Sequence, residues 1–176
     1  CSVNHITLEQ DLNHDYKAPN TPTTYGEFIG RNDGGNTIDG GQFVASGVTT
    51  KDGEYYITSA EGFAWVEAQS DAFFAGKTIK LAKNIDMTGV EYNPIRFWDP
   101  ENKTTFDGQN FTISNITIGN KSLDTAALFN GTLSVQNLKI DKATVTGRGY
   151  VAVIGGNIYG NIHNCHISNS TVIGNY

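Results

Sequence analysis

The sequence has few cysteines, little charge and no long apolar run, and each shortage argues against a class of protein. The two cysteines, Cys1 and Cys165, belong to neither a Cys-x-x-Cys pair nor a Cys/His cluster, which argues against a structural zinc site. No run of Lys or Arg occurs and the formal net charge is −6, so nucleic-acid binding lacks its usual electrostatic support. No apolar stretch approaches the roughly 18 residues that a membrane-spanning helix needs.

The residues that are present favour a β protein of one domain. The chain has 176 residues, of which 38% are hydrophobic and 17% charged, so it has enough apolar content for a core. Glycine is abundant, with 20 residues, and so are Thr, Asn and Ile. Because β-branched residues favour strands while Gly and Asn favour turns, this mixture predicts strands joined by turns.

The first residue, Cys1, has two interpretations. Bacterial lipoproteins begin with a lipid-bearing cysteine once the signal peptide has been removed, and the polar stretch 2–24 would then be a flexible tether. The alternative is an arbitrary boundary of the sequence. On the first interpretation Cys1 is the lipidation site, and the protein reaches a membrane only through this lipid anchor.

The ranges 1–53 and 54–176 differ in pattern. The first is rich in Gly, Asn, Asp and Thr, which predicts turns at 33–36 and 38–41 with a short strand at 42–45. We therefore expect an N-terminal tether and a loosely ordered region over 1–53, followed by the structured part of the chain.

One helix is predicted within residues 54–75. Thr58 and Glu61 fit a capping box, in which Thr58 caps the helix and Glu61 is its third residue. Phe63 and Val66 supply an apolar face at helical spacing. The residues ahead of Thr58 are typical of a short strand.

Three later segments share one pattern, in which an apolar residue, any residue and Asn are followed by apolar, any and apolar residues. The segments are 113–118, 135–140 and 162–167, and they place Asn115, Asn137 and Asn164 in one slot, at somewhat unequal intervals. Repeats of about 20–30 residues made of short strands without helices predict a solenoid of stacked coils.

Stacking explains why such a pattern repeats. One coil cannot bury its own inward residues, whereas stacked coils bury aliphatic side chains on one another and pair their backbones at about 4.8 Å. Asn at a bend tolerates a left-handed backbone and can hydrogen-bond to its equivalent in the next coil. We therefore predict one structural ladder, with Asn115, Asn137 and Asn164 one above another, and further inward faces at 126–129 and 151–154.

These segments resemble a known family. The stretch 106–118, followed by 127–130 and 135–140, resembles right-handed parallel β-helix surface proteins with GLUG-type repeats, lipoproteins and adhesins of Bacteroidetes-like bacteria. The stretches 56–65, 79–87 and 93–95 are similar to the capping helix and first coils of those proteins. The resemblance covers about residues 55–176. It implies an all-β fold, a right-handed parallel β-helix with an N-terminal capping α-helix.

The resemblance also implies a function. It suggests a non-catalytic binding or adhesion module, at the bacterial surface or secreted, that presents loops and aromatic side chains to a glycan or a host protein and needs no cofactor. Asn130-Gly replaces the Phe-Gly step that is usual in the family. The pattern stops just past Asn164, where an unpaired coil exposes a strand edge. Either more chain follows, or a cap, a partner or end-to-end self-association covers this edge.

Two other functions stay open. Polysaccharide lyases and glycoside hydrolases also use parallel β-helices, with clustered carboxylates, basic residues or calcium on the coil faces. Against this, 16 of the 18 acids lie at or before Asp107, and no charged residue follows Arg148. The acidic candidates, each with a turn or loop role as its alternative, are Asp86, Glu91, Asp99, Glu101 and Asp107. The other possibility is a structural segment of a larger surface or pilus-like protein.

Aromatic side chains supply the candidate ligand-binding residues. Phe97 and Trp98 lie between two prolines and beside Arg96, and an exposed Trp with Arg can stack on a sugar ring. The alternative is that both rings fill the side of the first coils. Tyr150 and Tyr159 lie near later turns and form a second candidate strip.

Four further residues have weaker assignments. His163 and His166 alternate onto an outer face, but no further ligand is visible, so no metal site is predicted. Cys165 is expected to be a small buried hydrophobic residue. Thr125, within Asp-Thr-Ala, resembles the acceptor of O-glycosylation in Bacteroidetes.

Overall fold

The computed structural model describes residues 44–175 with the exception of 46, 70 and 100. The chain divides into two compact units, Cys1–Phe43 and Val44–Tyr176, and all described residues belong to the second. The predictions for Cys1, for the tether at 2–24 and for the turns before residue 42 therefore lie outside the described residues.

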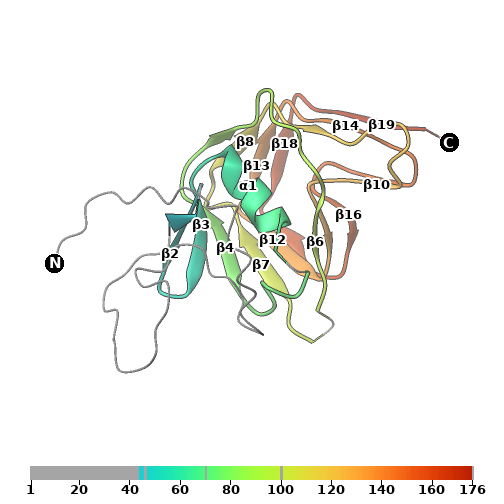
Figure 1. The fold of residues 1–176 in the computed structure, drawn as a ribbon. Coiled ribbons are helices and arrows are strands. Elements are labelled where there is room, and N and C mark those ends of the chain that lie inside the picture. Colours follow the sequence, from blue (N-terminus) through green and yellow to red (C-terminus); the bar gives the residue numbers. More distant parts are fainter. Residues whose placement is uncertain (1–43, 46, 70, 100, 176) are drawn as a thin grey trace, which may run out of the picture. The chain divides into compact units, whose positions relative to one another are not determined.

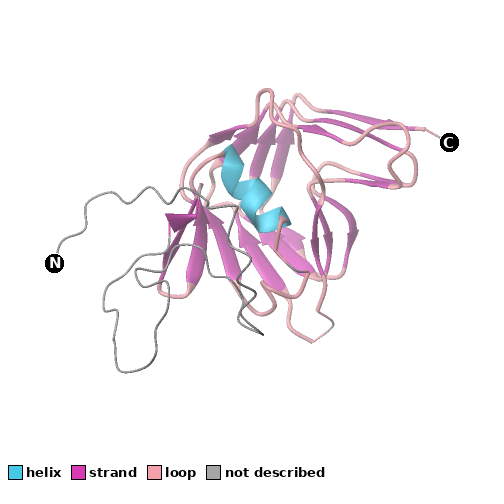
Figure 2. Cartoon of the chain, viewed as in Figure 1, coloured by secondary structure: helices cyan, strands magenta, loops and turns pink. Residues whose placement is uncertain are grey.

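Short strands make up nearly all of the regular structure, and α1 (Ala60–Glu67) is the one helix of the described part (Figure 2). The predicted all-β class is confirmed. The strands are β1 (Val44–Ala45), β2 (Val48–Lys51), β3 (Glu54–Ile57), β4 (Thr78–Leu81), β5 (Ile85–Asp86), β6 (Ile95–Phe97), β7 (Thr104–Asp107), β8 (Thr112–Ser114), β9 (Thr117–Ile118), β10 (Thr125–Ala126), β11 (Phe129–Gly131), β12 (Leu133–Gln136), β13 (Lys139–Asp141), β14 (Thr144–Gly147), β15 (Tyr150–Val151), β16 (Gly155–Ile158), β17 (Ile162–His163), β18 (His166–Ser168) and β19 (Thr171–Gly174).

From β4 onward the strands follow one another around four successive coils of a solenoid (Figure 1). Coil 1 holds β4 to β6, coil 2 holds β7 to β11, coil 3 holds β12 to β16 and coil 4 holds β17 to β19. Each coil pairs its strands in parallel with those of the coil before it. The resulting sheets run along the stack in the orders β3-β4-β7-β12-β17, β5-β8-β13-β18, β6-β11-β16, β9-β14-β19 and β10-β15. This parallel β-helix confirms the predicted solenoid.

Paired residues in coils 2, 3 and 4 are separated by a constant number of residues over several strands. Ile113 pairs with Ile140 and Ile140 with Ile167, while Val145 pairs with Val172. Because the same strand face points inward in every coil, this register stacks aliphatic side chains in columns. Ile113, Ile140 and Val145 are at most 1% exposed, so these columns form the core.

The end of the solenoid at coil 1 is covered. There β3 pairs in parallel with β4, and β2 pairs antiparallel with β3. Helix α1 lies against β3 and β6. Its Phe63 ring contacts Tyr92 and Phe106 at centroid separations of 6.0 and 6.4 Å. The apolar face predicted for this helix therefore packs against the first two coils.

Two predictions at this end need correction. The N-cap of α1 is Ser59 rather than Thr58, and no side chain caps the helix; the Ser59 hydroxyl donates to Glu61 instead. The region expected to be loosely ordered up to residue 53 includes β2, which pairs with β3 along its whole length. The unit that holds the solenoid accordingly begins at Val44.

Coils 2 to 4 turn through corners whose backbone is left-handed, and these corners form two columns. Gln136 pairs with Asp107 and with His163, so the residues that follow β12 and β17 are equivalent. Ser114 pairs with Asp141, and Asp141 with Ser168, so the residues that follow β8, β13 and β18 are equivalent. The first column contains Asn137 and Asn164, and the second contains Asn115, Lys142 and Asn169, all with φ between 48° and 57°.

The prediction of a single three-rung ladder is therefore wrong for Asn115. Asn164 Nδ2 donates to Asn137 Oδ1 at 2.6 Å, so these two stack as expected. Asn115 belongs to the other column, with Lys142 and Asn169. The error arose because consecutive corners of one coil share the same apolar pattern. Asn137 is the corner before Lys142, the true equivalent of Asn115, so the interval from Asn115 to Asn137 is shorter than one full coil.

Candidate functional site

Four exposed side chains meet beside the ends of β6 and β16, and we call them the aromatic cluster: Asp71, Arg96, Trp98 and Tyr159. The Trp98 and Tyr159 rings lie edge to face, with centroids 5.9 Å apart and an interplanar angle of 82°. The Arg96 guanidinium lies 5.8 Å from the Trp98 ring centroid, and its Nε is 3.2 Å from Asp71 Oδ2. Trp98 is 46% and Tyr159 53% exposed, so both rings remain accessible.

The alternation of β6 decides which of its side chains reach this cluster. Ile95 and Phe97 point into the core and are each 1% exposed, while Arg96 between them points outward. The prediction that Phe97 contacts a ligand is therefore wrong, because its ring packs on Phe74 and Phe129 with centroids 6.0 Å away in both cases. For Phe97, the alternative role of filling the coil interior is the observed one.

Backbone hydrogen bonds fix both aromatic residues of the cluster. Trp98 N–H donates to the Asp71 carbonyl at 3.0 Å, and Tyr159 N–H donates to the Gly131 carbonyl at 2.9 Å. Gly131 has φ +101°, and a Cβ there would lie 1.9 Å from the Phe97 carbonyl oxygen, so only glycine allows this close approach of coils 1 and 2. The backbone at both residues is thus anchored, and the edge-to-face contact joins the two rings.

The charges of the cluster orient groups more than they stabilise the fold. The Arg96 and Asp71 side chains are 59% and 49% exposed, and ion pairs this exposed contribute about 0–1 kcal/mol. Their value is geometric, because guanidinium donors and carboxylate acceptors lie next to an aromatic face. This combination suits a sugar, whose apolar face stacks on a ring while its hydroxyls bond to neighbouring polar groups.

Of the five predicted ligand-binding residues, the structure brings together Arg96, Trp98 and Tyr159. Tyr150 is 61% exposed on β15, but within the described residues no ring contact joins it to another aromatic side chain. The two strips expected from the sequence, one before residue 100 and one after residue 150, are therefore partly one surface. Solenoid stacking joins them, since Trp98 follows coil 1 strand β6 and Tyr159 follows coil 3 strand β16.

Three of the coil-face carboxylates hold corner asparagines. Asn115 Nδ2 donates to Asp86 at 2.9 Å, Asn137 Nδ2 to Asp107 at 3.1 Å, and Asn169 Nδ2 to Asp141 at 2.7 Å. In each case the asparagine lies in the coil that follows the aspartate. The turn roles considered for Asp86 and Asp107 are thus joined by a role between coils, which the sequence pattern did not indicate.

These hydrogen bonds lower the pKa of all three carboxyl groups. The bond from Asn115 is the main cause for Asp86, and the bond from Asn169 is the main cause for Asp141. Burial raises the pKa of Asp107, but bonds from the Gln109 N–H and from the Gln136 and Asn137 amides outweigh burial and bring the pKa below its usual range. All three carboxylates are therefore stabilised in the charged form as structural groups.

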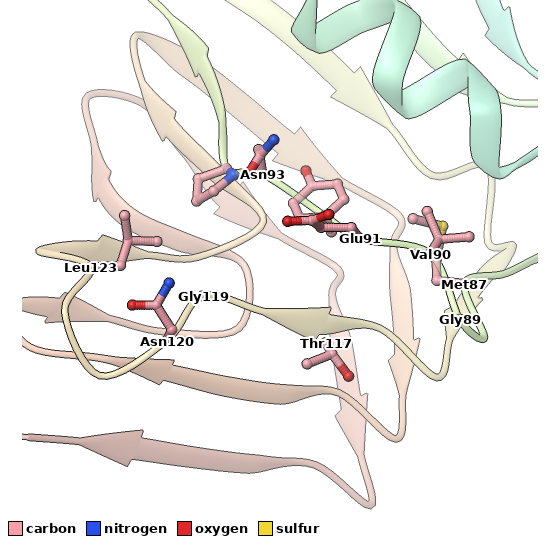
Figure 3. Close-up of a pocket in the computed structure, with 11 residues that line it drawn as sticks. Met87, Gly89, Val90, Glu91, Asn93, Thr117, Gly119, Asn120 and Leu123 are labelled. Atoms are coloured by element: carbon pink, nitrogen blue, oxygen red, sulfur yellow. The ribbon is translucent and has the colours of Figure 1, made fainter.

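The other predicted acids lie in a loop and beside a cavity. Asp99 accepts hydrogen bonds from the backbone N–H groups of Glu101 and Asn102, at 2.9 and 2.7 Å, which makes this stretch a tight polar turn. Glu91 lines a cavity of about 430 Å³ between coils 1 and 2 (Figure 3). Among the described residues, no side-chain hydrogen bond or ion pair joins either acid to the aromatic cluster.

The remaining single-residue predictions have mixed outcomes. His163 and His166 are both exposed, as are their neighbours Ile162 and Ile167, so their exposure does not test the predicted alternation. Among the described residues, no three His, Cys, Asp or Glu side chains are placed to hold a metal ion. Cys165 is half-buried, and burial raises the pKa of its thiol. Thr125 is half-buried in β10 beside an exposed Asp124, and its glycosylation stays a prediction.

Sequence reasoning missed Asp71 and missed the contact between Trp98 and Tyr159. Asp71 lies in a segment without recognisable periodicity, and only its contacts with Trp98 and Arg96 place it. The contact between the rings depends on register, since β6 and β16 both pair with β11. The length of the repeat was the available signal, because counting whole coils along the sequence places the residues after β6 and β16 on the same side of the solenoid.

The fold and the cluster define a class: the chain is a β-solenoid protein with an exposed aromatic surface on one side of its coils. Comparison with models of protein families, with curated proteins and with solved structures found no match. None of the helical structure within the described residues is long and apolar enough to cross a membrane.

Proposed function

We propose that this protein is a non-catalytic glycan-binding module that uses the aromatic cluster and acts at a bacterial surface or after secretion. The observation that carries the proposal is the pair of accessible rings, Trp98 and Tyr159, held edge to face beside the Arg96–Asp71 ion pair. Large exposed aromatic side chains that gather at one place mark interaction surfaces more often than they stabilise a fold.

The scaffold supports such a role because it fixes the cluster before binding. The residues come from three separate places along the chain and are anchored by backbone hydrogen bonds within and between coils. A binding surface that is already ordered loses little conformational entropy when it meets a ligand. A rigid solenoid therefore suits repeated, weak contacts with a polymeric sugar.

The use of the carboxylates favours binding over hydrolysis. Glycoside hydrolases need a pair of carboxyl groups across the scissile bond. Asp86, Asp107 and Asp141 each accept hydrogen bonds from a corner asparagine, which keeps them ionised and occupied. The enzyme alternative has less support than the binding module for this reason.

The test is a glycan array with the soluble chain, followed by calorimetry with the glycans that bind. Trp98→Ala should lower the affinity by about tenfold or more, because it removes the stacking surface. Tyr159→Ala should lower it by a smaller factor, since the tyrosine mainly buttresses the tryptophan.

The matched control is Tyr150→Ala, which removes an exposed tyrosine outside the cluster. Its affinity should stay within about twofold of the unaltered protein. The proposal fails if no glycan binds, or if Trp98→Ala and Tyr150→Ala bind equally well. Release of sugar fragments during the incubation would favour the enzyme instead.

A further inference from the structure

Coil 1 takes a shorter path than the later coils on one side of the solenoid. Between β5 and β6 the chain uses only 87–94, whereas the matching stretch runs over 115–128 in coil 2 and over 142–154 in coil 3. Within the described residues, coil 1 accordingly contributes no strand to the β9-β14-β19 and β10-β15 sheets. Its pairing at this edge is an isolated bridge between Tyr92 and Ile118.

The shorter path leaves a cavity of about 430 Å³ beside β9. One wall comes from coil 1, with Glu91 and Asn93, and the facing wall comes from coil 2, with Thr117, Asn120 and Leu123 (Figure 3). Ligand sites for small molecules have volumes of about 300–1,000 Å³, so the cavity is large enough for one hexose-sized molecule.

Among the described residues that line the cavity, the one charged side chain is the acidic Glu91. Glu91 is exposed and, within the described residues, has no hydrogen-bond or ion-pair partner. The described residues that line the cavity include no Lys, Arg or His. Asn120 Oδ1 accepts the Ser122 N–H at 2.9 Å, so its Nδ2 donors remain for a ligand.

The remaining lining completes the chemistry. Asn93 and Thr117 add amide and hydroxyl groups, while Met87, Val90 and Leu123 add an apolar wall. Apolar surface with a few convergent polar groups is the usual composition of a site for a small ligand. An unpaired carboxylate in a cavity whose lining carries no cation attracts a positively charged donor and repels anions.

We propose that this cavity binds a small hydroxylated ligand that carries a primary ammonium group, namely an amino sugar. The ammonium pairs with Glu91, and the ligand hydroxyls bond to Asn93, Thr117 and Asn120. The site shares no residue with the aromatic cluster, so the two proposals stand or fall separately.

The test is a titration of the isotope-labelled protein followed by amide NMR at neutral pH, with glucosamine as the probe. Glucosamine should shift the amide signals of Gly89, Glu91, Gly119 and Asn120, which line the cavity. Glucose has the size of glucosamine without the charge, and N-acetylglucosamine is a larger neutral derivative; both should bind at least about fivefold more weakly. Equal binding of the three sugars, or no shift at these residues, overturns the proposal.

A further arm of this titration separates an amino sugar from a simple amine. 1,4-Diaminobutane carries ammonium groups but no hydroxyls, so it should bind more weakly than glucosamine. Equal or tighter binding of the diamine would overturn the assignment to a sugar.

Two variants test the charge of the cavity directly. Glu91→Gln keeps the shape and should weaken glucosamine about fivefold, while Glu101→Gln, an exposed acid in another loop, should have no effect. Asn120→Asp keeps the acceptor for the Ser122 N–H and replaces the Nδ2 donors with a carboxylate oxygen, which accepts from the ligand's hydroxyl and ammonium groups, so it should tighten glucosamine binding. Because misfolding cannot strengthen binding, a gain with Asn120→Asp supports the proposal, and unchanged binding in both cavity variants refutes it.

Discussion

The two ends of the solenoid continue the same side-chain columns but differ in what covers them. At coil 1, Ile79 and Ile85 are 0% and 2% exposed, since β3 pairs with β4 and α1 lies over the first coils. At coil 4, Ile162 and Ile167 of the same columns are 46% and 44% exposed. The burial of an aliphatic residue in this protein is therefore decided by the layer beyond it and not by its own pattern.

The largest effect is expected from a matched pair of truncations in one column. Ile140→Ala removes a side chain that is 1% exposed and has a coil on either side, so it should cost about 2–5 kcal/mol of unfolding free energy. Ile167→Ala makes the same change at the open end and should cost less than about 1.5 kcal/mol. Urea unfolding measures both values. Equal losses would mean that coil 4 is covered in solution, which would contradict the difference between the two ends of the solenoid.

A second pair concerns the corner asparagines and should give a smaller difference. Asn137 and Asn164 have φ of 52° and 51°, so substitution by Ala costs the same backbone strain at both, about 1–2 kcal/mol. Both variants lose the bond from Asn164 to Asn137, and Asn137→Ala also removes the bond to Asp107, which adds about 1 kcal/mol.

Thermal unfolding of the two corner variants should rank Asn137→Ala below Asn164→Ala. Asn137→Gly tests the reason, since it relieves the strain while still lacking the hydrogen bonds. If Asn137→Gly were as stable as the unaltered protein, the side-chain bonds would contribute nothing.

A third expectation concerns acid. The folded-state pKa of Asp107 is lower than its unfolded value, so its contribution to stability is complete above the unfolded pKa, about 3.9, and is lost as the pH falls through the folded pKa. Asp86 and Asp141 act in the same direction. The free energy of unfolding should therefore fall as the pH is lowered below about 5.

Asp107→Asn isolates one of these contributions. The amide cannot ionise, so the variant should lose about 1 kcal/mol at neutral pH and show a shallower fall in stability below about pH 5. Denaturant titrations at a series of pH values measure the slope. A slope identical to that of the unaltered protein would show that the Asp107 carboxylate has no role in acid stability.

The mildest test changes no residue. Amide hydrogen exchange should be faster in β17, β18 and β19 of coil 4 than in β12, β13 and β14 of coil 3, by about 100-fold. Within the described residues, coil 3 has a neighbouring coil on both sides, whereas coil 4 has one on a single side. Exchange followed by NMR or mass spectrometry would settle the ratio. Uniform protection would point to association through the open end.

The solenoid was predictable because its signal repeats. The segments around Ile113, Ile140 and Ile167 carry the same apolar alternation, and stacking is the one arrangement that buries all of them. Side chains also alternate along β6, so Arg96 points outward and Phe97 points inward. The pattern could not show which of the two corner columns each asparagine belongs to, because two consecutive corners of one coil have the same apolar pattern.

The candidate site was predictable only in part. Trp98 and Arg96 drew attention because they lie close together between turns, and Tyr159 because it lies near a later turn. Their contact depends on which coil turns beside which, and Asp71 had no signal at all. The cavity beside Glu91 arises from a difference in arc length between coils, which becomes visible only when the coils are aligned.

By itself, the sequence determined the fold class, the inward columns and the strands between turns, because hydrophobic burial and backbone pairing at a fixed period leave few other arrangements. The tertiary structure alone decided which asparagines share a corner and which rings meet. It also decided where coil 1 leaves a cavity and which column members stay open to solvent. These features depend on register and on the layer beyond each residue, and neither is encoded in any single segment.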